Sequence, residues 1–270
     1  MTLTPRLVDI GLNLAHDSFD HDRDHVVATA RAAGVAHMVI TGSTLDSTVA
    51  AIELVRSDPA TFRCTAGVHP HHAGEFRQDD LSRLRELLGA PEVAAAGECG
   101  LDYFRNFSTH EDQERAFRAQ LELAAECRKP VFLHQRDAHD AFVAILKDYL
   151  PRLPGGVAHC FTGEERDLRD YLDLGLSVGI TGWICDERRG QHLRDLVRLI
   201  PLDRLMAETD APYLLPRDLN PKPSHRRNEP KYLPHVVKTI AACRGEPYGT
   251  VAAATTLNAL QFFGFQPASG

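Results

Sequence analysis

Short apolar runs recur along the whole chain, and amphipathic stretches separate them. Eight runs have the length and the nearly continuous apolar character of strands that are buried on both faces. They cover residues 6–11, 37–42, 62–68, 92–98, 129–134, 155–160, 175–180 and 203–208. A parallel sheet covered by helices needs strands of this kind. The pattern therefore predicts a parallel sheet rather than antiparallel hairpins.

Stretches between these runs have helical spacing, with apolar residues every three or four positions. The clearest are residues 111–128 and 140–150. Repeated alternation of strand and helix predicts a (β/α)8 TIM barrel that spans residues 1–270 as one domain. An open doubly wound sheet is the alternative, but no Gly-x-Gly-x-x-Gly follows the first strand. The Pro-rich stretch 215–234 is interpreted as a long loop after the eighth strand, before C-terminal helices.

Composition agrees with one large α/β domain. The chain has 270 residues, of which 43% are hydrophobic, and a net charge of −7. This charge argues against broad non-specific binding to polyanions but is compatible with a local basic site. No run of about 18 apolar residues is present, so no membrane span is predicted. No coiled-coil heptad or long apolar surface stretch is evident, and we expect a monomer.

Location is predicted from the N-terminus and the cysteines. The first residues lack the basic and apolar regions of a signal peptide. The six cysteines are scattered without a Cys-x-x-Cys pair and lie mostly in apolar segments. They are interpreted as buried thiols in a reducing compartment, which favours the cytoplasm.

Candidate metal ligands follow several of the predicted strands. They are His69, Glu98, His134, His159, Glu208 and Asp210. Any one of them could simply cap a helix or form a structural hydrogen bond. Functional side chains of a barrel gather at the carboxyl ends of its strands, however, so the recurrence favours one site. Two imidazoles with two carboxylates can bind Zn²⁺, Mn²⁺ or Mg²⁺.

Six motifs together carry a family resemblance. They are GVHPHH, GECGLDY, PVFLHQRDA, HCFTG, GITGWICDERRG and ETDAPYLLPRDLNPKPSHRRNEP. The combination resembles the TatD family of metal-dependent deoxyribonucleases, which are amidohydrolase-like barrels. The resemblance extends from about Val8 to the final helices. It implies that Glu98, His134, His159 and Asp210 bind metal, and that Glu98 and Asp210 are the catalytic carboxylates.

The resemblance also implies further roles around the metal. His69 and Arg136 match positions at the phosphate-binding end of the pocket, and Asp102 is expected to orient its neighbours. The first strand departs from the family, because Gly11-Leu12-Asn13 stands where most members have His-x-His. Gly11 cannot bind a metal, and Asn13 offers only a weak carbonyl ligand. We therefore expect one well-formed metal position and a thinly ligated second one, with Mg²⁺ favoured and Mn²⁺ or Zn²⁺ as alternatives.

The function implied by the resemblance is that of a 3′-to-5′ exonuclease that hydrolyses single-stranded or frayed DNA, in repair or degradation. Basic residues near the expected mouth could bind phosphates, although surface ion pairs would occupy some of them. They are Arg136, Arg188, Arg189, Lys222, Arg226 and Arg227. Trp183 and Tyr213 are candidates for stacking on a base, with a packing role favoured for Trp183. Two alternatives stay open: a small-molecule hydrolase acting on amides, lactones or phosphoesters, and a non-catalytic binding protein derived from this fold.

Overall fold

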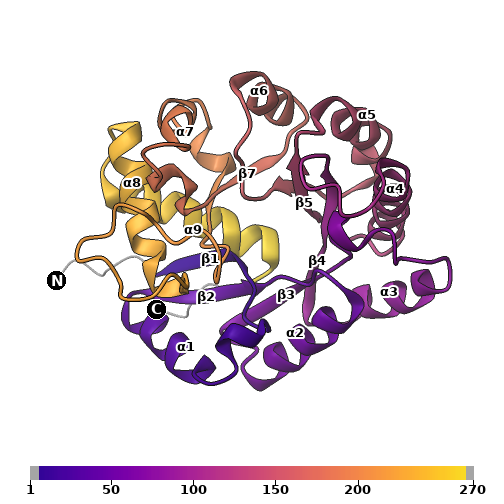
Figure 1. Cartoon of the computed structure of the whole chain (residues 1–270), viewed down its shortest axis with the longest axis horizontal. Coiled ribbons are helices and arrows are strands. Elements are labelled where there is room, and N and C mark those ends of the chain that lie inside the picture. Colours follow the sequence, from indigo (N-terminus) through magenta and orange to yellow (C-terminus); the bar gives the residue numbers. More distant parts are fainter. Residues whose placement is uncertain (1–5, 266–270) are drawn as a thin grey trace.

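The computed structural model describes residues 6–265. Within them, eight strands form one sheet in sequence order, and each strand pairs in parallel with the next. Figure 1 shows these strands surrounding a common axis. The strands are β1 (Leu7–Leu12), β2 (Val35–Ile40), β3 (Phe62–Ala66), β4 (Val93–Asp102), β5 (Val131–Arg136), β6 (Gly156–Ala158), β7 (Ser177–Ile180) and β8 (Leu205–Ala207).

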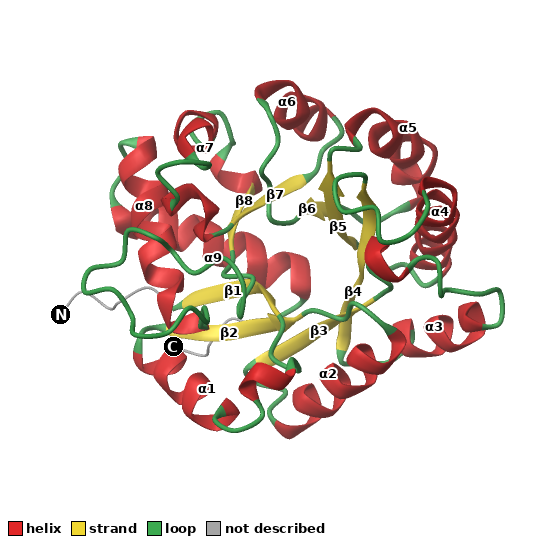
Figure 2. Ribbon diagram, in the orientation of Figure 1, coloured by secondary structure: helices red, strands yellow, loops and turns green. Residues whose placement is uncertain are grey.

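Helices form a ring outside the strands, as Figure 2 shows. They are α1 (Arg23–Ala32), α2 (Leu45–Ser57), α3 (Asp80–Leu88), α4 (His110–Glu126), α5 (His139–Tyr149), α6 (Glu165–Asp173), α7 (Gln191–Leu196), α8 (Leu233–Arg244) and α9 (Tyr248–Phe263). The two helices expected at 111–128 and 140–150 are α4 and α5. No described helix is long and apolar enough to cross a membrane.

The sheet nearly closes between β8 and β1. The backbone N–H of Asp210 donates to the carbonyl of Gly11 at 2.8 Å, and that of Asn13 donates to Ala211 at 2.8 Å. Leu12 and Ala211 form a parallel bridge at the same place. The predicted (β/α)8 barrel is therefore confirmed, and the open-sheet alternative is wrong.

Most strand ends lie within two residues of the predicted runs, and two further differences concern the end of β4 and the end of the long loop. β4 continues to Asp102, four residues beyond the predicted strand 92–98, because its last residues pair with β5 as far as Arg136. The long loop ends before the expected residue 234. A short 3-10 helix covers Pro230–Tyr232, and α8 already begins at Leu233. Pro234 is compatible with that start, because the first turn of a helix needs no backbone donor there.

The core has two parts that the strands separate. The larger part packs the outer faces of the strands against the helices. The smaller part combines inward-facing strand residues, such as Val8, Ile10 and Phe132, with Phe263 of α9. α9 contacts both β1 and β8. This inner layer fills the barrel beneath the strand ends that carry the candidate ligands.

Candidate metal centre

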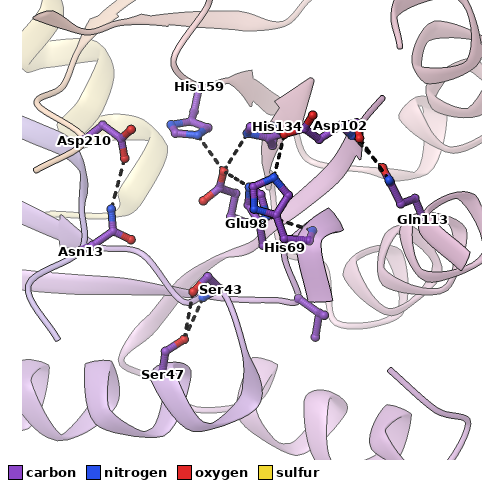
Figure 3. Close-up of polar contacts among 12 residues, drawn as sticks. Asn13, Ser43, Ser47, His69, Glu98, Asp102, Gln113, His134, His159 and Asp210 are labelled. Carbon is purple, nitrogen blue, oxygen red and sulfur yellow. Dashed lines mark hydrogen bonds and ion pairs between the residues drawn. The ribbon is translucent and has the colours of Figure 1, made fainter. Parts of the chain in front are cut away.

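Three imidazoles converge on one carboxylate oxygen at the mouth of the barrel. Glu98 Oε1 lies 3.3 Å from His69 Nε2, 3.0 Å from His134 Nδ1 and 2.9 Å from His159 Nε2. Figure 3 shows the three rings gathered around Glu98. They come from different segments, since His69 follows β3, His134 lies in β5 and His159 follows β6. Four of the six candidate strand-end residues therefore gather around one carboxylate oxygen.

The backbone of β4 brings Glu98 to this position. Gly97 has φ of +142°, and a Cβ there would lie 2.1 Å from the carbonyl oxygen of Phe132. Only glycine permits both the backbone conformation and this close approach to β5. The pairing of β4 with β5 shifts register between Ala96 and Cys99 at the same place. The Glu98 N–H then donates to the carbonyl of Gly42 at 2.8 Å, which holds the carboxylate toward the axis.

The residues present fit a divalent metal. His69, Glu98 and His134 each offer a ligand atom, and these atoms lie within 4.8 Å of one another. Donors bound to one ion at about 2.0–2.2 Å are separated by about 3.0–3.5 Å from each other, close to the distances found here. His134 Nε2 is buried and has no hydrogen-bond partner. The imidazole nitrogens of His69 and His134 can bind a transition metal, and the carboxylate of Glu98 can bind a transition metal or Mg²⁺.

Electrostatics in the cluster favour the charged forms of Glu98 and His159 and the neutral form of His69. Burial acts to raise the pKa of Glu98, but His159 and His69 outweigh it and hold that pKa well below its usual value. Burial acts to lower the pKa of His159, but Glu98 and Glu208 raise it well above the usual value. Burial lowers the pKa of His69 to about 4. A bound cation would take the place of the protons that balance these carboxylates.

Glu208 is a second buried carboxylate that fixes His159 from the opposite side. Its Oε2 lies 3.0 Å from His159 Nδ1, and its Oε1 accepts the backbone N–H of Cys160. The side chain passes against Gly11, where a Cβ would lie 2.3 Å from Oε2. The glycine in the first strand thus leaves the space that Glu208 fills. A histidine at that position would collide with this carboxylate.

Asp210 lies across the mouth from the cluster, on the segment that closes the barrel (Figure 3). Its Oδ1 accepts a hydrogen bond from Asn13 Nδ2 at 3.1 Å. Burial raises the pKa of Asp210 to about 7. Asn13 therefore contacts Asp210 as a donor. The first strand supports the carboxylate in this arrangement.

Asp102 joins the cluster to the loop that follows β4. Its Oδ2 lies 2.8 Å from His71 Nε2 and 3.5 Å from His134 Nε2. Burial acts to raise its pKa, but the neighbouring imidazoles of His134 and His71 lower it strongly. The Asp102 backbone N–H donates to Gln113 Oε1 at 2.8 Å, a contact drawn in Figure 3. The expected orienting role of Asp102 is consistent with these contacts.

A cleft of about 740 Å³ lies over the segments that follow β5, β6 and β7 and the first turns of α5 and α6, and its lining includes Arg136, Arg189 and Trp183. Among residues 6–265, no side chain of the cluster around Glu98 lines this cleft. The expectation that surface pairs occupy some basic residues is met at two positions. Arg189 lies 3.3 Å from Asp186. Arg227 forms ion pairs with Asp22 at 2.6 Å and with Glu229 at 3.2 Å.

The barrel and the site together define a class of protein. Imidazoles and carboxylates gathered at the mouth of a (β/α)8 barrel are typical of amidohydrolase-like hydrolases. The model of the TatD related DNase family matches residues 8–264 of this chain. The chain therefore belongs to the TatD related DNase family, and the resemblance seen in the sequence is confirmed.

Individual relatives agree over nearly the whole chain. A protein from Erwinia tasmaniensis named 3′-5′ ssDNA/RNA exonuclease TatD is 54% identical, over 95% of this chain and 99% of its own. Two solved structures superpose closely. A TatD homologue from Escherichia coli K12 has a TM-score of 0.87 with 26% identity, over 96% of this chain and 98% of its own. A TatD family hydrolase from Entamoeba histolytica has a TM-score of 0.88 with 26% identity, over 98% of this chain and 100% of its own.

Several residues of the site were missed by sequence reasoning or given too little weight. Glu208 is among the candidate ligands, but its contact with His159 is not predicted from the sequence, although its spacing of two from Asp210 is a signal. His71 follows His69 by two positions and was passed over in the same motif. Gln113 gave no signal, because a glutamine within a helix normally faces solvent.

Proposed function

We propose that this protein is a divalent-metal-dependent exonuclease that removes nucleotides from the 3′ ends of single-stranded DNA and RNA. The observation that carries the proposal is the convergence of His69, His134 and His159 on Glu98 Oε1 in a member of this family. The name of the Erwinia tasmaniensis relative supports the direction of cleavage and the single-stranded substrate.

The metal would be held by Glu98, His134 and His159, with His69 as a further donor, and Asp210 near the second position. When bound, it would polarise the phosphoryl group and lower the pKa of water. We propose Mg²⁺, with Mn²⁺ or Zn²⁺ as alternatives. The carboxylates of Glu98 and Asp210 and the phosphate oxygens of the substrate suit Mg²⁺, whereas the imidazoles are the donors that Zn²⁺ or Mn²⁺ would use.

The protein's own groups have separate tasks in this mechanism. Asp210 takes the proton from the attacking water and returns it to the 3′ oxygen of the preceding nucleotide as the P–O bond to that oxygen breaks, and Asn13 holds its carboxylate in place. Glu208 fixes the tautomer of His159, because it accepts the Nδ1 proton and leaves Nε2 for the site. Arg136 binds a non-bridging phosphate oxygen at the edge of the cleft. Product release from the open mouth completes the cycle.

The test uses a single-stranded oligonucleotide labelled at its 3′ end, with Mg²⁺ and then with EDTA. The wild-type protein should release labelled mononucleotides only with metal, and Glu98→Gln should lower the rate at least 100-fold, in line with loss of a metal ligand. Glu122→Gln is the matched control, because Glu122 pairs with Arg152 on the surface. A wild-type protein that hydrolyses esters or lactones but no nucleic acid would overturn the proposal. A protein with no turnover and no metal uptake would do the same.

Three further predictions belong to this proposal. We propose that the protein acts as a monomer in the cytoplasm, and that it takes part in DNA repair or degradation. Sedimentation and fractionation of cells would test the first two. Sensitivity of a deletion strain to DNA-damaging agents would test the third.

A further inference from the structure

Large apolar side chains that face solvent are concentrated at the mouth of the barrel. Among residues 6–265 they are Phe104, Phe107, Leu199, Tyr213 and Leu257. The three aromatic ones follow β4 or β8 at their carboxyl ends, where the metal cluster lies. The two leucines lie elsewhere, before β8 and in α9. Scattered exposed leucines need no explanation, but aromatic rings gathered around a catalytic mouth do.

Phe104 and Phe107 belong to one short loop, residues 103–109 between β4 and α4, and are 53% and 68% exposed. This loop is directly attached to the metal cluster. Asp102 Oδ1 accepts the backbone N–H of Phe104 at 3.0 Å, while its Oδ2 contacts His71 at 2.8 Å. The Phe107 ring packs edge-on against the His71 ring, with 4.8 Å between their centroids.

The loop is rigid although its aromatic rings are exposed. Ser108 Oγ donates to the carbonyl of His71 at 3.0 Å, and Gln113 Nε2 donates to the carbonyl of Ser108 at 3.0 Å. The Tyr103 ring stacks on His110 with 3.5 Å between centroids and an angle of 8°. A loop so well anchored holds its exposed rings in place before any ligand arrives. Binding to such a surface costs little conformational entropy.

Cationic groups accompany these rings. The Arg136 guanidinium lies 3.8 Å from the centroid of Phe104, and that of Arg105 lies 5.8 Å from it. An aromatic ring beside guanidinium groups matches the alternation of base and phosphate along a single strand. A base in a duplex is already stacked on its neighbours and cannot reach such a ring.

From these contacts we propose that Phe104 and Phe107 form a base-stacking site for the unpaired nucleotides next to the 3′ end. The proposal rests on the exonuclease function proposed above and names the residues that make it selective for single strands. Asp102 holds the loop next to the metal cluster. A strand that stacks on Phe104 and Phe107 therefore has its terminal phosphodiester at the cluster. Arg136 then binds the phosphate beside the stacked base.

The experiment measures KM and kcat on single-stranded DNA for wild type, Phe104→Ala, Phe107→Ala and the double variant. Each single change should raise KM about tenfold with kcat little changed, as expected for loss of one stacked base. The ratio of kcat/KM between single-stranded and blunt duplex DNA should fall in the double variant. Phe107→Trp should keep wild-type KM, whereas Phe107→Leu, which keeps apolar area without a ring, should not. Leu257→Ala is the control for removing an exposed apolar side chain far from the mouth.

A second substrate, with abasic residues at its last two 3′ positions, separates stacking from other effects. The KM of the wild type should rise on this substrate about as much as the KM of the double variant rises on normal DNA. The KM of the double variant should not rise further on the abasic substrate. Unchanged KM in the alanine variants, or wild-type KM in Phe107→Leu, would overturn the stacking site while wild-type cleavage upholds the exonuclease. Absence of cleavage by the wild type would instead overturn the proposed function. The melting temperature and metal content of every variant should equal those of the wild type, because both side chains are exposed.

Discussion

Gly11→Ala is the sharpest test of how the site is built. The added Cβ would lie 2.3 Å from Glu208 Oε2 and 3.4 Å from Phe132 Cζ. Glu208 cannot yield on its other side, because it also packs against Gly179, where a Cβ would lie 2.5 Å from Oε1. Its carboxylate must therefore move away from the N–H of Cys160 and from His159 Nδ1.

The magnitude follows from those lost contacts. Leaving a buried donor without its partner costs about 1–3 kcal/mol, and overpacking a core costs a similar amount. We expect the free energy of unfolding to fall by about 3 kcal/mol. For a chain of this size, that corresponds to a melting temperature lower by roughly 6–12 °C. Nuclease activity should fall at least about tenfold, because His159 loses the group that orients it.

Thermal unfolding and the oligonucleotide assay measure the two effects, with Gly249→Ala as the control. Gly249 lies in the first turn of α9, and a Cβ there would meet nothing within 4 Å. This control should be neutral or slightly stabilising. The double variant Gly11→Ala with Glu208→Asp should recover part of the stability, because the shorter acid vacates the space. If Gly11→Ala melts and cleaves like the wild type, then Glu208 is not confined as described and does not position His159.

Three other predictions concern metal, pH and the loop. Mg²⁺ or Mn²⁺ at 100 times its Kd should stabilise the wild type by about 2.7 kcal/mol, and Glu98→Gln should abolish most of this shift in thermal unfolding. Burial raises the pKa of Asp9 to about 7. The folded protein therefore binds the Asp9 proton more tightly than the unfolded chain does. This proton contributes its full free energy to folding below about pH 4, and the contribution is lost as the pH rises toward 7. The melting temperature of wild type should therefore fall relative to Asp9→Asn across that range, and parallel curves would contradict the burial effect. Gln113→Leu should lower the free energy of unfolding by about 2–4 kcal/mol in urea titrations, because Gln113 forms hydrogen bonds with the backbone of Asp102 and Ser108. A change below about 0.5 kcal/mol would show that these backbone groups find other partners.

The fold could be predicted because each strand is coded locally. Runs such as 37–42 and 175–180 are apolar throughout, and a strand that is buried on both faces needs no partner to be recognised. The meeting of His69, Glu98 and His134 could be predicted for the same reason. Once parallel strands close into a barrel, their carboxyl ends share one mouth whatever the details of packing.

The remaining features depend on contacts between distant residues. Gly11 looked like a missing ligand, because the sequence does not show that Glu208 occupies the space above it. Nothing in the sequence marks Gln113 as buried, because only the fold brings the backbone of Asp102 against it. Phe107 gave no sign of exposure, since an isolated phenylalanine is buried more often than not.

Asp102 divides its two oxygens between two tasks. Oδ2 contacts His71 and lies near His134, whereas Oδ1 accepts the backbone N–H groups of Phe104 and Arg105. A shift of the carboxylate toward the histidines therefore changes its hydrogen bonds to the loop, and a shift toward the loop changes its contacts with the histidines. If the metal and the strand bind as proposed, any free energy by which the metal steadies Asp102 appears again as tighter binding at the loop, and nucleic acid at the loop raises the affinity for metal by the same factor. Through this one side chain, the two proposed sites would act on each other.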